Sequence, residues 1–232
     1  MTTAYQPFPP GSQPAYLVPT YGSTARRAPH QPLVAVAPTI ERAGPVFAPA
    51  AYPVAADLSR HAGRHALGQR IAVAGRVTDE ADRPVRDAMI EIWQANAAGR
   101  YQHERDSRDA PIDANFHGAG RVFTDGDGRY RFVSIKPGAY PWRNHANAWR
   151  PSHIHFSMFG PSWGARLVTQ MYFADDPLLA IDPIYQAVPD AAARARLLCA
   201  FDLDLTEPEY ALGFRFDIVL RGLHATPMEG AR

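Results

Sequence analysis

The sequence predicts an all-β domain, an antiparallel β-sandwich with long loops, one short helix and an extended N-terminal arm. From Gln69 onward, short runs rich in β-branched and aromatic residues alternate with turn residues, as is typical of a sandwich or barrel. Residues 1–55 instead hold half of the chain's 22 prolines, a density that disfavours helix and central strand. We therefore expect a proline-rich arm and linker over residues 1–55 and a sandwich core over residues 56–232.

Charge and cysteine content exclude several classes of function. The 24 basic and 23 acidic residues leave a formal charge of +1, so the chain has no basic footprint for nucleic acid and no polybasic membrane patch. Cys199 is the only cysteine, which excludes an internal disulfide framework and fits a reducing compartment. No segment approaches the ~18 apolar residues that span a bilayer. We expect a soluble, cytoplasmic protein.

The β-rich region divides into hairpins and single strands. Residues 70–77 and 88–93 alternate as strands around a turn at 80–84, which predicts a hairpin. Residues 122–124 and 130–134 flank Asp125-Gly-Asp-Gly128 and predict a second hairpin, because Asp-Gly supplies the positive backbone angles of a tight turn.

Three further strands and one helix complete the prediction. The strands are expected over residues 153–158, 167–173 and 213–220. The helix is expected over residues 190–201, with Asp190 capping an alanine- and leucine-rich run. Between these elements, the loops 95–120 and 138–151 are rich in Trp, Tyr, His and Arg. Long loops of this kind inside a domain are usually functional, so we expect them to build a site.

His153-Ile154-His155 is the first candidate for that site. The two-residue period of a strand directs both imidazoles to one face, where they could chelate one metal ion. Taken alone, such a pair more often forms a half-buried polar face than a metal site, and a zinc or copper hydrolase or oxidase using it stays an alternative.

Two tyrosines, Tyr101 and Tyr140, and Arg150 precede the histidines in the sequence. Tyr101 and Tyr140 could each be an ordinary sandwich tyrosine with one buried face and one wet hydroxyl. As a metal ligand, however, a phenol with an unperturbed pKa of about 10 requires a strong, hard Lewis acid. Ferric iron is the natural candidate. A non-catalytic sandwich remains a second reading, since residues 73–85 also resemble the opening hairpin of prealbumin-like binding modules.

Three runs carry a resemblance to a known family: EIWQANAAGRY (91–101), IKPGAYPWRN (135–144) and WRPSHIHF (149–156). They resemble the intradiol ring-cleaving dioxygenases, and the similarity extends to the arm (21–46) and the last core strand (210–222). The resemblance implies a prealbumin-like sandwich holding non-haem Fe(III) through Tyr101, Tyr140, His153 and His155. The sequence differs from the family pattern at residues 102–109, which lack the second tyrosine that the family usually has there.

The resemblance also implies a substrate and roles for further residues. The reaction would be O2-dependent cleavage of protocatechuate (3,4-dihydroxybenzoate) in aromatic degradation, with another substituted catechol or hydroxyquinol as the alternative substrate. Relatives pair this kind of chain with a smaller homologous α subunit, as αβ heterodimers within larger oligomers. The implied catalytic residues are Arg150, Gln170 and Tyr140, the ligand that leaves when substrate binds. The implied substrate-binding residues are Trp93, Trp142, Ile184 and, at the carboxylate end, Tyr21 and Arg27.

Overall fold

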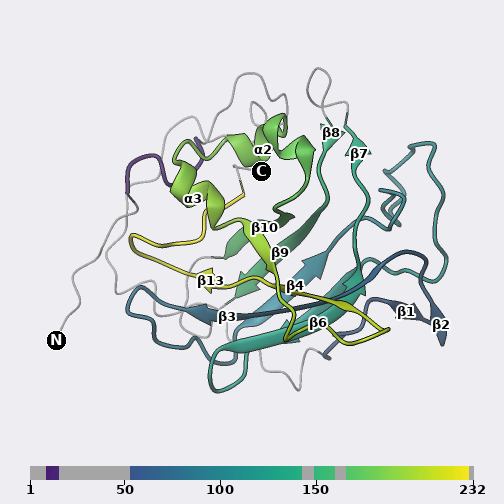
Figure 1. Cartoon of the computed structure of the whole chain (residues 1–232), viewed down its shortest axis with the longest axis horizontal. Coiled ribbons are helices and arrows are strands. Elements are labelled where there is room, and N and C mark those ends of the chain that lie inside the picture. The colour runs from purple at the N-terminus through teal and green to yellow at the C-terminus, as the bar shows by residue number, and fades with distance from the viewer. Residues whose placement is uncertain (1–8, 16–52, 143–148, 160–165, 230–232) are drawn as a thin grey trace.

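Two layers of β-strands pack face to face in the computed structural model, which describes residues 9–15, 53–142, 149–159 and 166–229 (Figure 1). One layer has the strand order β5 (Ala119–Phe123), β4 (Met89–Trp93), β9 (His153–Phe159) and β10 (Leu167–Phe173). The other contains β6 (Arg129–Ile135), β3 (Arg70–Thr78), β12 (Leu212–Arg215) and β13 (Ile218–Val219). The predicted β-sandwich is therefore confirmed.

Strand β11 (Leu198–Phe201) connects the two layers. Its first half pairs in parallel with Tyr172 and Phe173 of β10. Its second half pairs antiparallel with β12. Strands β12 and β13 both run parallel to β3, so the pairing is mixed where the prediction had only antiparallel strands.

The core lies between the layers and fixes which way each strand faces. In β9, Ile154, Phe156 and Met158 are completely buried in it. The Phe156 ring packs against Tyr130 and Phe132 of the opposite layer, with ring centroids 6.0 and 5.9 Å away. Because side chains alternate along a strand, the histidines between these positions face away from the core.

Neither predicted hairpin forms, because the two strands of each do not pair with one another. Strand β3 pairs with β6, β12 and β13, whereas β4 pairs with β5 and β9. Strands β5 and β6 likewise lie in opposite layers. Their turn still forms as expected, with Gly128 at φ +74° and its N–H donating to the Asp125 carbonyl at 3.0 Å. Each of these connections crosses from one layer to the other, because both strands bury an apolar face in the same core from opposite sides.

The predicted helix over residues 190–201 is much shorter. Helix α3 covers Ala191–Ala195, with Asp190 accepting a hydrogen bond from the Ala193 N–H as the expected cap. Residues 198–201 form strand β11 instead, since pairing with β10 and β12 overrides their helical propensity. The predicted strand 213–220 is divided into β12 and β13 at Phe216, whose N–H donates to the Ala74 carbonyl.

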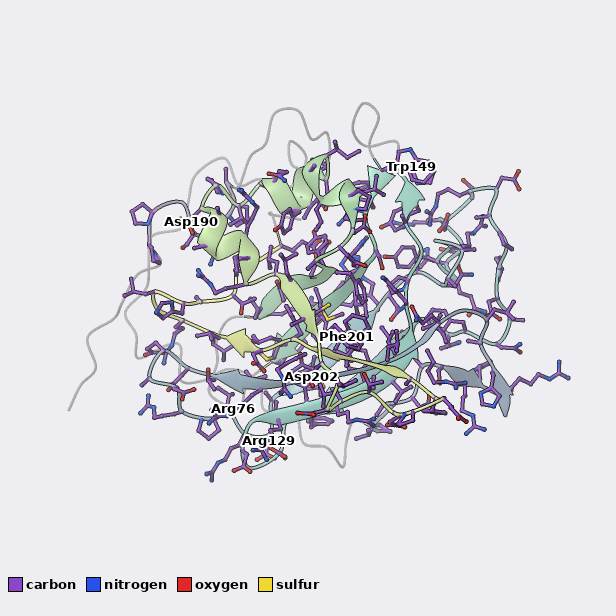
Figure 2. The ribbon with its side chains drawn as sticks, in the orientation of Figure 1. Arg76, Arg129, Trp149, Asp190, Phe201 and Asp202 are labelled. Atoms are coloured by element: carbon purple, nitrogen blue, oxygen red, sulfur yellow. The ribbon has the colours of Figure 1, made fainter. Side chains whose placement is uncertain are left out.

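Short elements gather at one end of the sandwich (Figure 1). They are η2 (Pro177–Ala180), α2 (Pro183–Gln186), α3 and the pair β7 (Tyr140–Pro141) and β8 (Trp149–Arg150). Figure 2 shows Trp149 at this end, far from Arg76 and Arg129 on β3 and β6. The hairpin β1 (Arg60–His61) and β2 (Arg64–His65) lies away from these elements, at the lower right of Figure 1. None of the helices in the described ranges is long and apolar enough to cross a membrane.

Gly75 of β3 tests how closely β3 approaches the junction of β12 and β13 beside it in the same layer. A Cβ at this position would lie 1.8 Å from the Phe216 carbonyl oxygen, a backbone atom that cannot move aside easily. We expect Gly75→Ala to lower the free energy of unfolding by about 3 kcal/mol, measured by urea denaturation. Gly126→Ala is the matched control, since nothing lies within 4 Å of its Cβ and it should change stability by less than about 0.5 kcal/mol. Equal stabilities of the two variants would contradict this packing.

Candidate metal centre

Four aromatic side chains meet beside the outward face of β9. Tyr101 comes from the loop after β4, Tyr140 from β7, and His153 and His155 from β9. The ring centroids are 5.7 Å apart for the two tyrosines, 5.6 Å for Tyr140 and His153, and 4.9 Å for the two histidines. Tyr101 and His155 close the group at 6.4 Å. The structure thus brings together all four residues that the sequence singled out as metal ligands.

The hydrogen bonds of the histidines define which ring nitrogen faces the centre. His153 Nδ1 lies 2.7 Å from the Pro151 carbonyl oxygen, which only accepts, so Nδ1 carries the proton. Its Nε2 lies 3.4 Å from the Tyr140 hydroxyl. His155 Nδ1 lies 3.2 Å from Glu229 Oε2. In both rings Nδ1 is engaged by a protein acceptor, so any metal would be bound through Nε2.

The Tyr101 hydroxyl is the clearest sign that a group belongs here. Its oxygen is buried and makes no hydrogen bond to any described residue. Burial raises the pKa of Tyr101 well above its usual value, and the nearby Tyr140 phenol adds to this although it is not in hydrogen-bonding geometry. A buried hydroxyl of this kind requires a partner, and the described part of the chain does not provide one. A strongly Lewis-acidic cation fits that requirement.

Phenols are essential to any metal site at this position. Among the described residues, no three side chains of the His, Cys, Asp or Glu type are grouped so as to hold a metal ion. The donors that the described residues offer at the candidate centre are two imidazoles and two phenols. Oxygen-rich, anionic ligands of this kind suit a hard trivalent cation better than zinc.

Arg150 places a buried positive charge next to the centre. Its side chain is 3% exposed, and Nε donates to Asp182 Oδ1 at 3.0 Å. Nη2 donates to Gln170 Oε1 and to the Tyr172 hydroxyl. Burial alone would lower the pKa of Arg150, but the Asp182 carboxylate outweighs it and raises the pKa. The guanidinium is therefore permanently charged and held in one orientation.

The strand register and Asp182 locate the other predicted residues. Trp93 and Gln170 are the register partners of His155 on β4 and β10, and the Trp93 ring stacks on His155 at 4.7 Å. The Trp142 ring centroid lies 5.3 Å from Arg150 Cζ. Ile184 is the second residue of α2 and donates its N–H to Asp182. Tyr21 and Arg27 lie outside the described residues.

The sequence reasoning missed the carboxylates that hold the site. Asp182 is one, although the Asp-Pro pair before a short helix is a recognisable capping signal. Glu229 is another, and no local pattern marks it. The third is Asp106 in the divergent 102–109 loop, which accepts hydrogen bonds from the Tyr101 N–H and from Arg108. Arg108 in turn lies over the Tyr140 ring, with Cζ 4.2 Å from its centroid.

Comparisons with known proteins agree on one family. Residues 42–222 match the family model described as Dioxygenase, and residues 5–39 match that of the protocatechuate 3,4-dioxygenase beta subunit N terminus. The chain is 56% identical over 225 residues to the protocatechuate 3,4-dioxygenase beta chain of Burkholderia cepacia, covering 94% of each. It is 32% identical to the alpha chain from that organism, over 68% of this chain and 75% of that one. The solved dioxygenase domain from Streptomyces sp. SirexAA-E matches with a TM-score of 0.53 and 26% identity, over 78% of this chain and 95% of that one.

Asp106 gives a pH-dependent test of the loop that carries Tyr101 and contacts the Tyr140 ring through Arg108. Burial opposes its ionisation, but hydrogen bonds from Arg108 and from the Tyr101 and Arg108 N–H groups lower its pKa from 3.8 to about 2. Its ionised form therefore stabilises the fold above about pH 4, and this contribution is lost as the pH falls towards 2. We expect Asp106→Asn to reduce the free energy of unfolding at pH 7 by about 1 kcal/mol and to flatten its fall below pH 4.

Asp109→Asn is the control for this experiment, because Asp109 is an exposed carboxylate in the same loop. Its unfolding free energy should follow that of the wild type across the pH range. Parallel pH curves for Asp106→Asn and the wild type would show that Asp106 does not stabilise the loop.

Proposed function

The chain belongs to the intradiol dioxygenase family, and we propose that it is the iron-bearing β subunit of a protocatechuate 3,4-dioxygenase. In this reaction both atoms of O2 enter 3,4-dihydroxybenzoate as the bond between its two hydroxylated carbons breaks, giving 3-carboxy-cis,cis-muconate. The observation that carries the proposal is the buried group of Tyr101, Tyr140, His153 and His155 in a chain 56% identical to such a beta chain.

We propose these four residues as the ligands of a non-haem Fe(III). The orphaned Tyr101 hydroxyl and the two engaged Nδ1 atoms support the assignment. Two tyrosinates also offset most of the charge of a ferric ion, which favours its burial. When bound, the iron would supply Lewis-acid activation of the catechol towards O2. Tyr140 Oη, as a phenolate, is suited to accept a proton from a catechol hydroxyl.

Arg150 and Gln170 are proposed to act on the substrate ring. A guanidinium fixed by Asp182 in a buried site stabilises developing negative charge without having to reorient. Gln170 accepts a hydrogen bond from Arg150 and is the strand-register partner of His155. It therefore connects the Arg150 guanidinium to the face of the sheet that carries the histidines. Arginine suits this role because it stays charged at every physiological pH.

Flat apolar walls and a charged end define the proposed substrate pocket. Trp93, Trp142 and Ile184 are its proposed walls, and aromatic and aliphatic surfaces suit a planar ring. Tyr21 and Arg27 are proposed to bind the carboxylate, which would favour protocatechuate over unsubstituted catechol. Another substituted catechol or hydroxyquinol is the alternative substrate.

A homologous α subunit is the proposed partner, in αβ heterodimers within a larger oligomer. Its basis is the 32% identity of this chain to an alpha chain. In this arrangement residues 1–55 form the arm and residues 56–232 the catalytic core, in a cytoplasmic enzyme of aromatic degradation. The single, buried Cys199 is consistent with a reducing compartment.

Iron content and colour test the ligand assignment. The purified protein, co-expressed with an α subunit, is expected to contain iron and to show the strong visible absorption of ferric tyrosinate. His155→Ala should lose most of the iron. Tyr140→Phe should keep iron but lose at least about 100-fold in kcat, because an acid–base group is removed.

The exposed His61, paired in the hairpin β1–β2, provides the control. His61→Ala should match the wild type in iron, absorption and rate. A colourless, iron-free wild type, or wild-type iron and turnover in both ligand variants, would refute the assignment.

Oxygen uptake distinguishes the substrates. We expect a kcat/KM for protocatechuate at least about 100-fold above that for catechol, since a paired carboxylate is worth about 3 kcal/mol. Hydroxyquinol should also react slowly. A preference for catechol or hydroxyquinol would favour the alternative substrate class while leaving the iron site intact.

A further inference from the structure

The segment 225–229 runs along β10 and ends beside the candidate metal centre. The Thr169 hydroxyl donates to the Pro227 carbonyl at 2.8 Å, and the Glu229 N–H donates to the Val168 carbonyl at 2.7 Å. On the other side, the Met228 N–H donates to Gln13 Oε1 at 2.7 Å. Strand β11 pairs with β10 only at residues 172–173, so the segment contacts β10 where β11 does not. Its backbone is therefore fixed relative to β10.

This anchoring buries the Glu229 carboxylate against His155. The Glu229 side chain is 4% exposed and that of His155 is 8% exposed, with Oε2 and Nδ1 3.2 Å apart. A carboxylate buried to this extent must be hydrogen-bonded, or its desolvation would strongly destabilise the fold. One face of the His155 ring is stacked on Trp93, with an interplanar angle of 6°. The ring is thus held by a face contact and by an edge contact.

The two histidines of the centre differ in their partners. His153 Nδ1 is paired with a neutral backbone carbonyl, whereas His155 Nδ1 is paired with a carboxylate. A hydrogen bond to a charged acceptor is the stronger kind, and it makes the opposite ring nitrogen a better electron donor. The geometry therefore makes the two imidazoles unequal as ligands.

We propose that Glu229 is a positioning residue for the metal centre, acting through His155. Its carboxylate holds the proton of His155 on Nδ1, fixes the ring orientation, and strengthens Nε2 as a donor to ferric iron. The segment 225–229 is then part of the active site, although it lies far in sequence from the proposed metal ligands. This inference rests on the proposed function, because it assumes that His155 binds iron.

The test compares Glu229→Gln and Glu229→Ala with the wild type, each purified with the α subunit. Iron affinity is measured by chelator competition, alongside the visible absorption band and the Tm of the iron-free protein. Glu229→Gln keeps an acceptor without the charge, so we expect about 10-fold weaker iron binding, and about 100-fold for Glu229→Ala. In both variants the band should move to longer wavelength, because a weaker His155 donor leaves the iron more electron-poor. The Tm of the iron-free Glu229→Gln protein should stay near that of the wild type.

Gly75→Ala is the matched control, because it is expected to destabilise the fold while the atoms nearest to its Cβ belong to Phe216 and Tyr130, outside the segment and the metal centre. It should lower the Tm while leaving the iron affinity and the band unchanged. Wild-type affinity and band in both Glu229 variants would overturn the inference, as would iron loss that follows the Tm in all three variants. A wild type without iron would instead overturn the proposed function, so the two failures are distinguishable.

Discussion

The register of β9 between β4 and β10 is the constraint on which the site depends. Ile154, Phe156 and Met158 are completely buried, so a slip of one residue would exchange them with the histidines and place two imidazoles in the core. The same register sets His155 between Trp93 and Gln170 and sets His153 opposite Tyr172. Core packing on one face of the sheet therefore fixes the chemistry on the other face.

Buried carboxylates then fix the side chains that the strands alone leave adjustable. Asp182 holds Arg150, Glu229 is paired with His155, and Asp106 joins the Tyr101 backbone to Arg108. Each pair removes charge from water, which is tolerated only because the partner is close and well oriented. The result is a set of ring and guanidinium orientations present before any ligand arrives, as electrostatic preorganisation requires.

Of these carboxylates, Asp182 belongs to the short elements at one end of the sandwich. Asp182 also caps α2 through the Ile184 and Tyr185 N–H groups, so one side chain positions both a helix and a charge. The second cluster of buried residues, which includes Tyr172, Tyr185 and Leu197, packs α2 and α3 against β10. Stability at this end and geometry of the centre thus depend on the same contacts.

The sequence by itself determined the sandwich class, the strands 153–158 and 167–173, and the four residues that form the aromatic group. The strands and the shared face of His153 and His155 follow from local rules, because side chains alternate along a strand. Tyr101 and Tyr140 were instead implied by the resemblance to the dioxygenase family. Only the tertiary structure decided that β3 and β4 lie in opposite layers, that residues 198–201 form β11, and that Glu229 is paired with His155. These depend on contacts between residues distant in sequence, for which local propensity and spacing carry no information.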